Sequence, residues 1–137
     1  MKRFLALLLV LLLTFSLAAC GKDDESTDNT NVYTEDSEIG QGDKTYYLHI
    51  VADDMDITLT VHTNEKNLGK SLRETGVVDG EESEHGLYIK TVNGVRADFA
   101  KDNAYWAFNI DGEMSMVGVD AVDIVDGETY ELVYTPA

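Results

Sequence analysis

Alternating apolar and polar positions run through most of this sequence, a pattern typical of β-strands. The clearest example is residues 104–110, where large apolar side chains, Trp106 among them, occupy every second position. A period of two places those side chains on one face of a strand and their neighbours on the other. The Asp-Gly pair at residues 111–112 favours a tight turn with positive φ angles. We therefore predict a central strand over residues 104–110 and a return arm over residues 113–117.

One segment changes its period and predicts a helix. Over residues 64–75, Leu68 and Leu72 stand four positions apart, and Gly76 follows where a helix would end. This short helix is expected to pack on the sheet through its two leucines. Further strands are expected at residues 45–51, 56–62, 87–92 and 128–134. A polar turn at residues 53–55 is expected to join the first two, and Asn93-Gly94 predicts a tight hairpin turn after the third. The connecting segments are expected to be an acidic loop at 77–86, a brief strand or loop at 95–101 and an irregular or short helical link at 118–125.

These elements indicate the α+β class, a mixed sheet with one helix packed on a face. Neither an internal repeat nor a βαβ alternation is visible in the sequence. The centre of the core is predicted from the central and last strands and comprises Trp106, Phe108, Tyr130 and Leu132. We expect a single domain over residues 44–137.

The first twenty residues have the pattern of a bacterial lipoprotein signal. Lys2 and Arg3 precede an apolar run that is short for a membrane span and ends in small residues. The sequence Leu-Ala-Ala-Cys at residues 17–20 resembles the lipoprotein box, in which the cysteine is diacylated and the chain is cut just before it. We expect a signal peptide over residues 1–19 and lipidation of Cys20 with palmitate-like chains, which would hold the protein outside the cytoplasm on the cell membrane of a Gram-positive bacterium. The alternative is a free thiol beside an ordinary secretory cleavage site.

The chain is strongly acidic, with 26 Asp and Glu against 10 Lys and Arg and a net charge of −16. Removal of Lys2 and Arg3 with the signal peptide would take the net charge from −16 to −18. This balance argues against nucleic acid as a partner and against attraction to anionic lipid headgroups. Residues 20–43 are mostly acidic or small and polar, so we expect a disordered tether. Cys20 is the only cysteine, which excludes an intrachain disulfide.

The order of motifs over residues 45–135 resembles two related groups of proteins. One is the C-terminal domain of the transcobalamin and intrinsic-factor family, and the other is a family of bacterial surface proteins of unknown function described as transcobalamin-like. The resemblance implies a β-grasp-like domain. In the animal carriers such a domain closes over one side of a cobalamin that is held mainly by a separate helical domain, which has no recognisable counterpart in this sequence. The motifs that carry the resemblance are Leu68 and Leu72 with Gly76, Gly86-Leu87-Tyr88, Asn93-Gly94, Tyr105-Trp106 with Phe108, Gly118-Val119, and residues 126–134.

The hairpin around the central strand is the expected ligand site. The resemblance implies that Trp106 and the turn at residues 111–116 lie against the ligand. Met114 and Met116 follow the turn two positions apart, and methionines suit adaptable apolar contacts, while Tyr105 lies beside Trp106 on the opposite face. We predict that these four side chains bind the ligand. The alternatives are that Trp106 belongs to the core and that the methionines cover the open end of the core.

Other candidate chemistry is sparse. His49, His62 and His85 show no spacing typical of a metal site, and we interpret them as solvated surface residues. The acidic positions within residues 120–126 do not match a calcium-binding loop. The sequence contains no catalytic motif, so we expect neither an enzyme nor a bound cofactor or metal.

Two functions are compatible with these features. The first is a membrane-anchored surface lipoprotein with a small-molecule-binding module, for a corrinoid such as cobalamin that is delivered to an uptake transporter. The alternative is a non-enzymatic protein-interaction or adhesion module that contacts another surface protein through the same hairpin or a sheet edge. A concave apolar patch around Trp106, Met114 and Met116 would favour a ligand, and a flat patch or a bare strand edge would favour a protein partner.

Overall fold

The structure is a computed structural model that describes residues 30–137. The predicted signal peptide, the predicted lipidation of Cys20 and the first part of the predicted tether lie outside the described residues. Within residues 30–137, no helix has the length and apolar character needed to cross a membrane.

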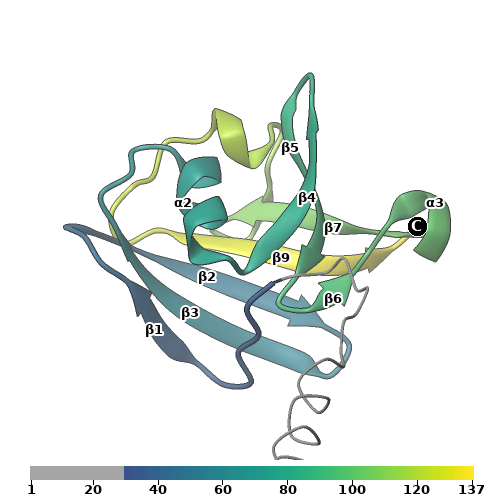
Figure 1. Ribbon diagram of the computed structural model, residues 1–137, viewed down its shortest axis with the longest axis horizontal. Helices are drawn as coiled ribbons and strands as arrows, with labels where there is room; N and C mark the ends of the chain where they lie inside the picture. The colour runs from purple at the N-terminus through teal and green to yellow at the C-terminus, as the bar shows by residue number, and fades with distance from the viewer. Residues whose placement is uncertain (1–29) are drawn as a thin grey trace, which may run out of the picture.

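Six strands form one mixed sheet. They are β1 (Ser37–Gly40), β2 (Lys44–Ala52), β3 (Met55–Thr63), β7 (Ala104–Ile110), β8 (Glu113–Met114) and β9 (Thr129–Pro136). Their order is β1-β3-β2-β9-β7-β8; the β1–β3 and β2–β9 pairs are parallel and the others antiparallel (Figure 1). The alternation in β2 places Tyr46, Leu48 and Ile50 on the core face, where all three are fully buried.

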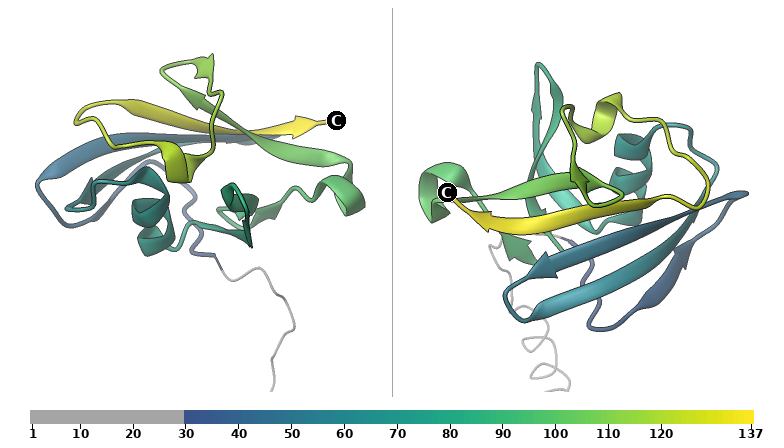
Figure 2. Two further views of the ribbon diagram at one scale, coloured as in Figure 1. Left: turned by 90° about the horizontal axis from the view of Figure 1, so that it is seen from above. Right: turned by 180° about the vertical axis from the view of Figure 1, so that it is seen from behind.

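A smaller layer covers one face of this sheet. It comprises helix α2 (Leu68–Thr75) and a three-stranded antiparallel sheet of β4 (Val78–Ser83), β5 (Gly86–Val92) and β6 (Val95–Arg96). The short helix α3 (Phe99–Asp102) leads from β6 into β7, and the 3-10 turn η1 (Val119–Ala121) lies between β8 and β9. Figure 2 shows α2 and the β4–β5 hairpin on the same side of the large sheet. The predicted α+β class, a mixed sheet with a helix packed on one face, is therefore confirmed.

Helix α2 packs on the sheet as predicted but begins later. Leu68 and Leu72 are fully buried, and Gly76, with a φ of +70°, ends the helix in a left-handed conformation. The side-chain oxygen of Asn67 accepts a hydrogen bond from the Lys70 backbone N–H at 3.0 Å. This N-cap fixes the start of the helix at residue 68, so the predicted start at residue 64 is wrong.

The predicted centre of the core is largely confirmed. Trp106, Tyr130 and Leu132 are buried, whereas Phe108 is half-buried and packs against the cluster. Tyr46 of β2 meets Tyr130 of the neighbouring β9 edge-on, with ring centroids 5.5 Å apart. Aromatic contacts of this geometry add to the free energy gained from area burial.

Both predicted tight turns form. Asp111 and Gly112 have φ angles of +51° and +85°, and the register pairs Ile110 with Glu113 across a two-residue loop. Asn93 and Gly94 have φ angles of +50° and +83° between β5 and β6. Positive φ at both central positions matches the right-handed twist of the flanking strands.

Two segments predicted to lack regular structure are strands. Residues 37–40, expected in the tether, form β1, which pairs in parallel with β3; the domain therefore begins before residue 44. Ile39 packs against the core, and Glu38 Oε2 lies 2.7 Å from His62 Nε2. Residues 78–83, expected in an acidic loop, form β4, an edge strand in which only Val78 is buried. Both strands lie at sheet edges, where a strand needs few apolar side chains. Their acidic composition therefore gave no strand pattern in the sequence.

Hydrogen bonds attach the first described residues to the rest of the domain. The Asn31 backbone N–H donates to the Gly76 carbonyl at 2.7 Å, and its side-chain amide donates to the Thr75 carbonyl at 2.9 Å. The Gly94 backbone N–H donates to the Thr30 hydroxyl at 2.7 Å. This segment therefore belongs to the folded domain and connects the end of α2 to the β5–β6 turn.

Candidate functional site

Trp106 lies at the centre of the aromatic hairpin and is held on two sides. Its indole N–H donates to the Lys90 carbonyl of β5 at 3.2 Å, and its ring meets Tyr134 of β9 edge-on at 5.7 Å. The side chain is 7% exposed. The structure thus places Trp106 in the core, with one part of its surface bordering a hollow.

That hollow is an apolar depression of about 170 Å³ between β5 and β7. Its floor includes Trp106 and Phe108, and η1 forms its end through Val119. Tyr105 belongs to the lining even though it is only half-buried and alternates with Trp106 along β7. The complete lining is Leu87, Tyr88, Ile89, Tyr105, Trp106, Phe108, Gly118 and Val119.

Met114 and Met116 lie outside the hollow and are open to solvent. Their exposed fractions are 69% and 93%, so they do not cover the open end of the core. Ser115 shapes the segment between them, because its backbone N–H donates to the Phe108 carbonyl at 3.0 Å and its hydroxyl donates to the Val117 carbonyl at 2.8 Å. The sequence analysis predicts that these four side chains form one site. The structure brings Tyr105 and Trp106 together in the lining of the hollow, whereas Met114 and Met116 lie outside it, just after the adjoining turn.

Asp120 fixes the end of the hollow in place. Its carboxylate accepts hydrogen bonds from the Arg73 guanidinium of α2 at 2.6 and 2.8 Å and from the Leu87 backbone N–H of β5 at 2.8 Å. The hydrogen bond from Arg73 lowers the pKa of Asp120 against the effect of partial burial, which raises it, and the Leu87 N–H lowers it further. Arg73 also contacts Glu82 of β4 at 3.0 Å. The sequence analysis missed this role of Asp120, since its partners lie 33 and 47 residues away.

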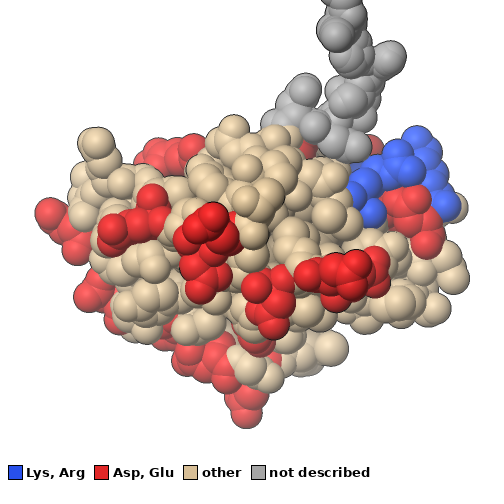
Figure 3. All heavy atoms as spheres, turned by 90° about the horizontal axis from the view of Figure 1, so that it is seen from below, with Lys and Arg blue, Asp and Glu red and all other residues tan. Residues whose placement is uncertain are grey.

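Acidic side chains outnumber basic ones in this chain, 26 against 10. Figure 3 shows them spread across one face, with Lys and Arg side chains gathered at one end of that view. Lys90, beside the Trp106 indole, pairs with Glu81 at 2.9 Å and Asp98 at 3.3 Å. No charged residue lines the hollow itself, which therefore offers mainly apolar contact.

Two of the three histidines, His49 and His62, bind carboxylates, whereas the sequence interpretation has all three as solvated surface residues. His49 Nε2 lies 2.7 Å from Asp56 Oδ1, and its Nδ1 lies 2.9 Å from Glu131 Oε2, on the face of the large sheet away from α2. Partial burial lowers the pKa of His49, but the hydrogen bonds to Asp56 and Glu131 raise it by more, so the net shift is upward. His62 pairs with Glu38, while His85 lies in an exposed turn. Among residues 30–137, no group of three or more His, Cys, Asp and Glu side chains is arranged to hold a metal ion.

A second, larger cleft lies between the β2–β3 turn and residues 32–34, with a volume of about 490 Å³. Its lining shares no residue with the hollow beside Trp106. The sequence analysis identified its two turns, at residues 53–55 and 93–94, without placing them together. Nothing in the local pattern signals that contact, because 38 residues separate Met55 from Asn93.

Comparisons with known proteins relate the chain to one family and to two solved structures. The sequence profile of a family described as a domain of unknown function (DUF4430) matches residues 66–135. A protein from Ruminococcus gnavus ATCC 29149, provisionally described as metal-binding, is 29% identical with a TM-score of 0.64, and the match covers 69% of this chain and 99% of that one. Haptocorrin, solved in complex with Cbi, is 19% identical with a TM-score of 0.51, over 68% of this chain and 25% of haptocorrin, which shows a shared fold. A search of the curated proteins finds no match.

Proposed function

This chain belongs to the family described as a domain of unknown function (DUF4430), and from that premise we propose that it is a membrane-anchored surface lipoprotein with a small-molecule-binding module. A corrinoid, passed on to an uptake transporter, is the ligand class proposed first. The carrying observation is the apolar hollow lined by Tyr105 and Trp106 next to the exposed Met114 and Met116, on a surface that is otherwise acidic.

The fold likeness to haptocorrin supports this choice of ligand. That structure is a complex with Cbi, and the matching region is a quarter of its chain. We interpret the present domain as β-grasp-like, because α2 packs on a mixed sheet in which β2 and β9 are parallel. An isolated domain of this size offers a corrin ring one face only, so we expect modest affinity unless a partner protein completes the site.

The lipid anchor is proposed from the sequence around Cys20. Two acyl chains on this residue would hold the protein on the membrane surface. We expect Cys20→Ser to release the chain into the culture medium or to block its processing, and labelling with a palmitate analogue to be lost in the variant. A variant that still carries the label would contradict this assignment.

Tryptophan fluorescence tests the ligand proposal directly, because Trp106 is the single tryptophan and borders the hollow. The chain from residue 20 onward, carrying Cys20→Ser, would be titrated with cobalamin and cobinamide with an inner-filter correction. We expect saturable quenching that weakens at least about tenfold in a Met114→Ala, Met116→Ala variant, a change of about 1.4 kcal/mol.

Phe99→Ala provides the matched control for this titration. Phe99 is also exposed and apolar, but it lies in α3 at the opposite end of β7 from the turn. Its removal should leave the quenching unchanged. Absence of quenching at high micromolar ligand, in a chain shown to be folded by circular dichroism, would contradict corrinoid binding by this domain.

The second candidate function is a non-enzymatic contact with another surface protein. The observation in its favour is that Met116 is almost fully exposed and does not line the hollow. Methionine-rich exposed patches suit contact with a protein. In that case the same Met114→Ala, Met116→Ala variant would lose crosslinking to a neighbouring surface protein while remaining silent in corrinoid titrations.

A further inference from the structure

The cleft between the β2–β3 turn and residues 32–34 has the dimensions of a small-molecule site. Its volume of about 490 Å³ lies within the range of roughly 300–1,000 Å³ typical of ligand pockets. One wall comes from β2, β3 and their turn, and the other from the N-terminal segment and the β5–β6 turn. The lining residues are Val32, Tyr33, Thr34, Ala52, Asp53, Asp54, Met55, Asp56, Ile57, Asn93 and Val95.

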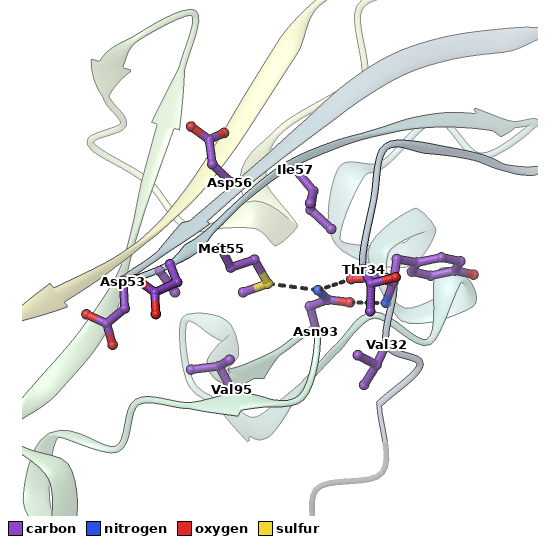
Figure 4. A pocket seen from close by; sticks show the side chains of 11 residues that line it. Val32, Thr34, Asp53, Met55, Asp56, Ile57, Asn93 and Val95 are labelled. Atoms are coloured by element: carbon purple, nitrogen blue, oxygen red, sulfur yellow. Dashed lines mark hydrogen bonds between the residues drawn. The ribbon is translucent and has the colours of Figure 1, made fainter.

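Asn93 makes the cleft a preformed one. This side chain is 3% exposed; its oxygen accepts from the Tyr33 backbone N–H at 2.7 Å, and its amide donates to the Tyr33 carbonyl at 2.9 Å and to Met55 Sδ at 2.9 Å. The two bonds to Tyr33 lie within one wall, and the bond to Met55 joins that wall to the other (Figure 4). The walls are therefore fixed to each other without a ligand, so binding would require little ordering of the protein.

The interior of the cleft is mostly apolar. Met55, Ile57 and Val95 line it together with Val32, which is exposed at its edge (Figure 4). The hydrogen bond from Asn93 holds the Met55 thioether in one orientation. An aromatic ring or a short alkyl chain would find contact surface there, because thioether and branched aliphatic groups pack well against such groups.

Two carboxylates, those of Asp53 and Asp54, stand at the rim of the cleft. Neither Asp53 nor Asp54 forms an ion pair or a side-chain hydrogen bond within residues 30–137, and the lining contains no Lys, Arg or His. Asp56 points away from the cleft and pairs with His49 (Figure 4). Turn geometry accounts for Asp53, whose φ is +44°, since Asp tolerates that conformation, but it does not require a carboxylate at Asp54.

We propose that this cleft binds a small organic cation, an ammonium group joined to an apolar body of about the size of a phenyl ring. The ammonium would lie between Asp53 and Asp54 at the rim, and the apolar body would contact Met55, Ile57 and Val95. The assignment is independent of the corrinoid proposal, because the two sites share no residue.

Three probes of one shape and different charge test the assignment. They are phenethylammonium, 2-phenylethanol and 3-phenylpropionate, each titrated into the ¹⁵N-labelled chain from residue 20 with Cys20→Ser, which keeps every described residue. We expect saturable amide shifts at Met55, Asn93 and Val95 with phenethylammonium, at least tenfold weaker binding of the alcohol, and no binding of the carboxylate.

Variants then separate charge from shape. Asp53→Asn with Asp54→Asn should weaken phenethylammonium binding at least tenfold, whereas Glu84→Gln with Glu113→Gln, which removes the same charge at exposed positions outside the cleft, should change it less than twofold. Val32→Trp, at the exposed edge, should block the cleft without disturbing the core. Equal binding of all three probes, equal losses in both charge variants, or no shifts at these amides up to 10 mM phenethylammonium would overturn the proposal.

Discussion

Asp120 illustrates how one side chain sets the position of several elements. It lies in η1, yet it receives hydrogen bonds from α2 through Arg73 and from β5 through Leu87. Charge-assisted hydrogen bonds contribute about 1.5–3 kcal/mol each when protected, and less where solvent screens them, as it does around the partly exposed Arg73.

We predict that Asp120→Asn lowers the free energy of unfolding by about 1–2 kcal/mol, because the neutral amide weakens both contacts with Arg73. Urea denaturation followed by Trp106 fluorescence measures the change. The matched control is Asp123→Asn, whose ion pair with Lys66 spans 3.8 Å between two exposed side chains and should change stability by less than about 0.5 kcal/mol. Equal losses in the two variants would contradict the role given to Asp120.

The lowered pKa of Asp120 also makes a prediction about acid stability. A carboxyl whose pKa is lower in the folded than in the unfolded state stabilises the fold above its unfolded pKa, about 3.9, and loses that contribution as the pH falls through the folded value. The stability difference between the wild type and Asp120→Asn should therefore be constant from pH 5 to 7 and shrink below pH 4. Urea midpoints at these pH values provide the measurement.

His49 predicts a pH dependence of the opposite sign. Its pKa is raised in the fold by Asp56 and Glu131, so its contribution is fully present below the unfolded value of about 6.5 and is lost as the pH rises through the folded value. We expect the wild type to lose stability from pH 6 to 8.5 relative to His49→Gln. A ¹H NMR titration of the imidazole should give a midpoint above 6.5, and a midpoint at or below that value would contradict the prediction.

Among the elements, the β7–β8 hairpin depends on the backbone conformation of its turn. Gly112 has a φ of +85°, and no atom lies within 4 Å of a Cβ built there, so a substitution would meet conformational strain alone. We predict that Gly112→Ala destabilises the protein by about 1 kcal/mol and that Gly112→Asn costs less, because Asn tolerates positive φ. Thermal unfolding of the two variants tests the order, and the reverse order would contradict the turn assignment.

Removal of the edge strand β1 should destabilise the fold. A chain that begins at residue 44 lacks the β1–β3 ladder, the packing of Ile39 and the hydrogen bond from the Tyr33 backbone N–H to the Asn93 side chain. We expect it to lose at least about 3 kcal/mol relative to a chain that begins at residue 30, from apolar burial and hydrogen bonds together. Equal urea midpoints for the two chains would show that the segment contributes nothing to the fold.

The strands and turns that the sequence predicts correctly are those whose signal is local. Tyr46, Leu48 and Ile50 alternate within one strand, and Asp111-Gly112 is sufficient to define its turn. Strands β1 and β4 were missed because an edge strand needs few apolar residues and gains its stability from a partner distant in sequence. The same limit applies to the candidate site: Tyr105 and Trp106 can be placed on β7 from their spacing, whereas their closeness to β5 and η1 depends on tertiary packing.

At the scale of the whole molecule, the two apolar depressions described above differ in size and in the charge around them. The hollow beside Trp106 is small and close to exposed methionines, and the cleft beside Met55 is larger and bordered by Asp53 and Asp54. We expect them to select different ligands: the proposed corrinoid for the hollow, whose lining has no charged residue, and a cation for the cleft. In a competition titration, cobinamide and phenethylammonium should therefore not displace each other.

The pinned segment at residues 30–34 has a mechanical consequence. Within residues 30–137, a pull toward the N-terminal end first loads the bonds of Thr30 and Asn31 to Gly94, Gly76 and Thr75, and then those between Tyr33 and Asn93. These contacts precede β1 along the line of force. Tension would therefore open the wall of the larger cleft before it strains the main sheet, and the cleft would respond to force earlier than the hairpin does.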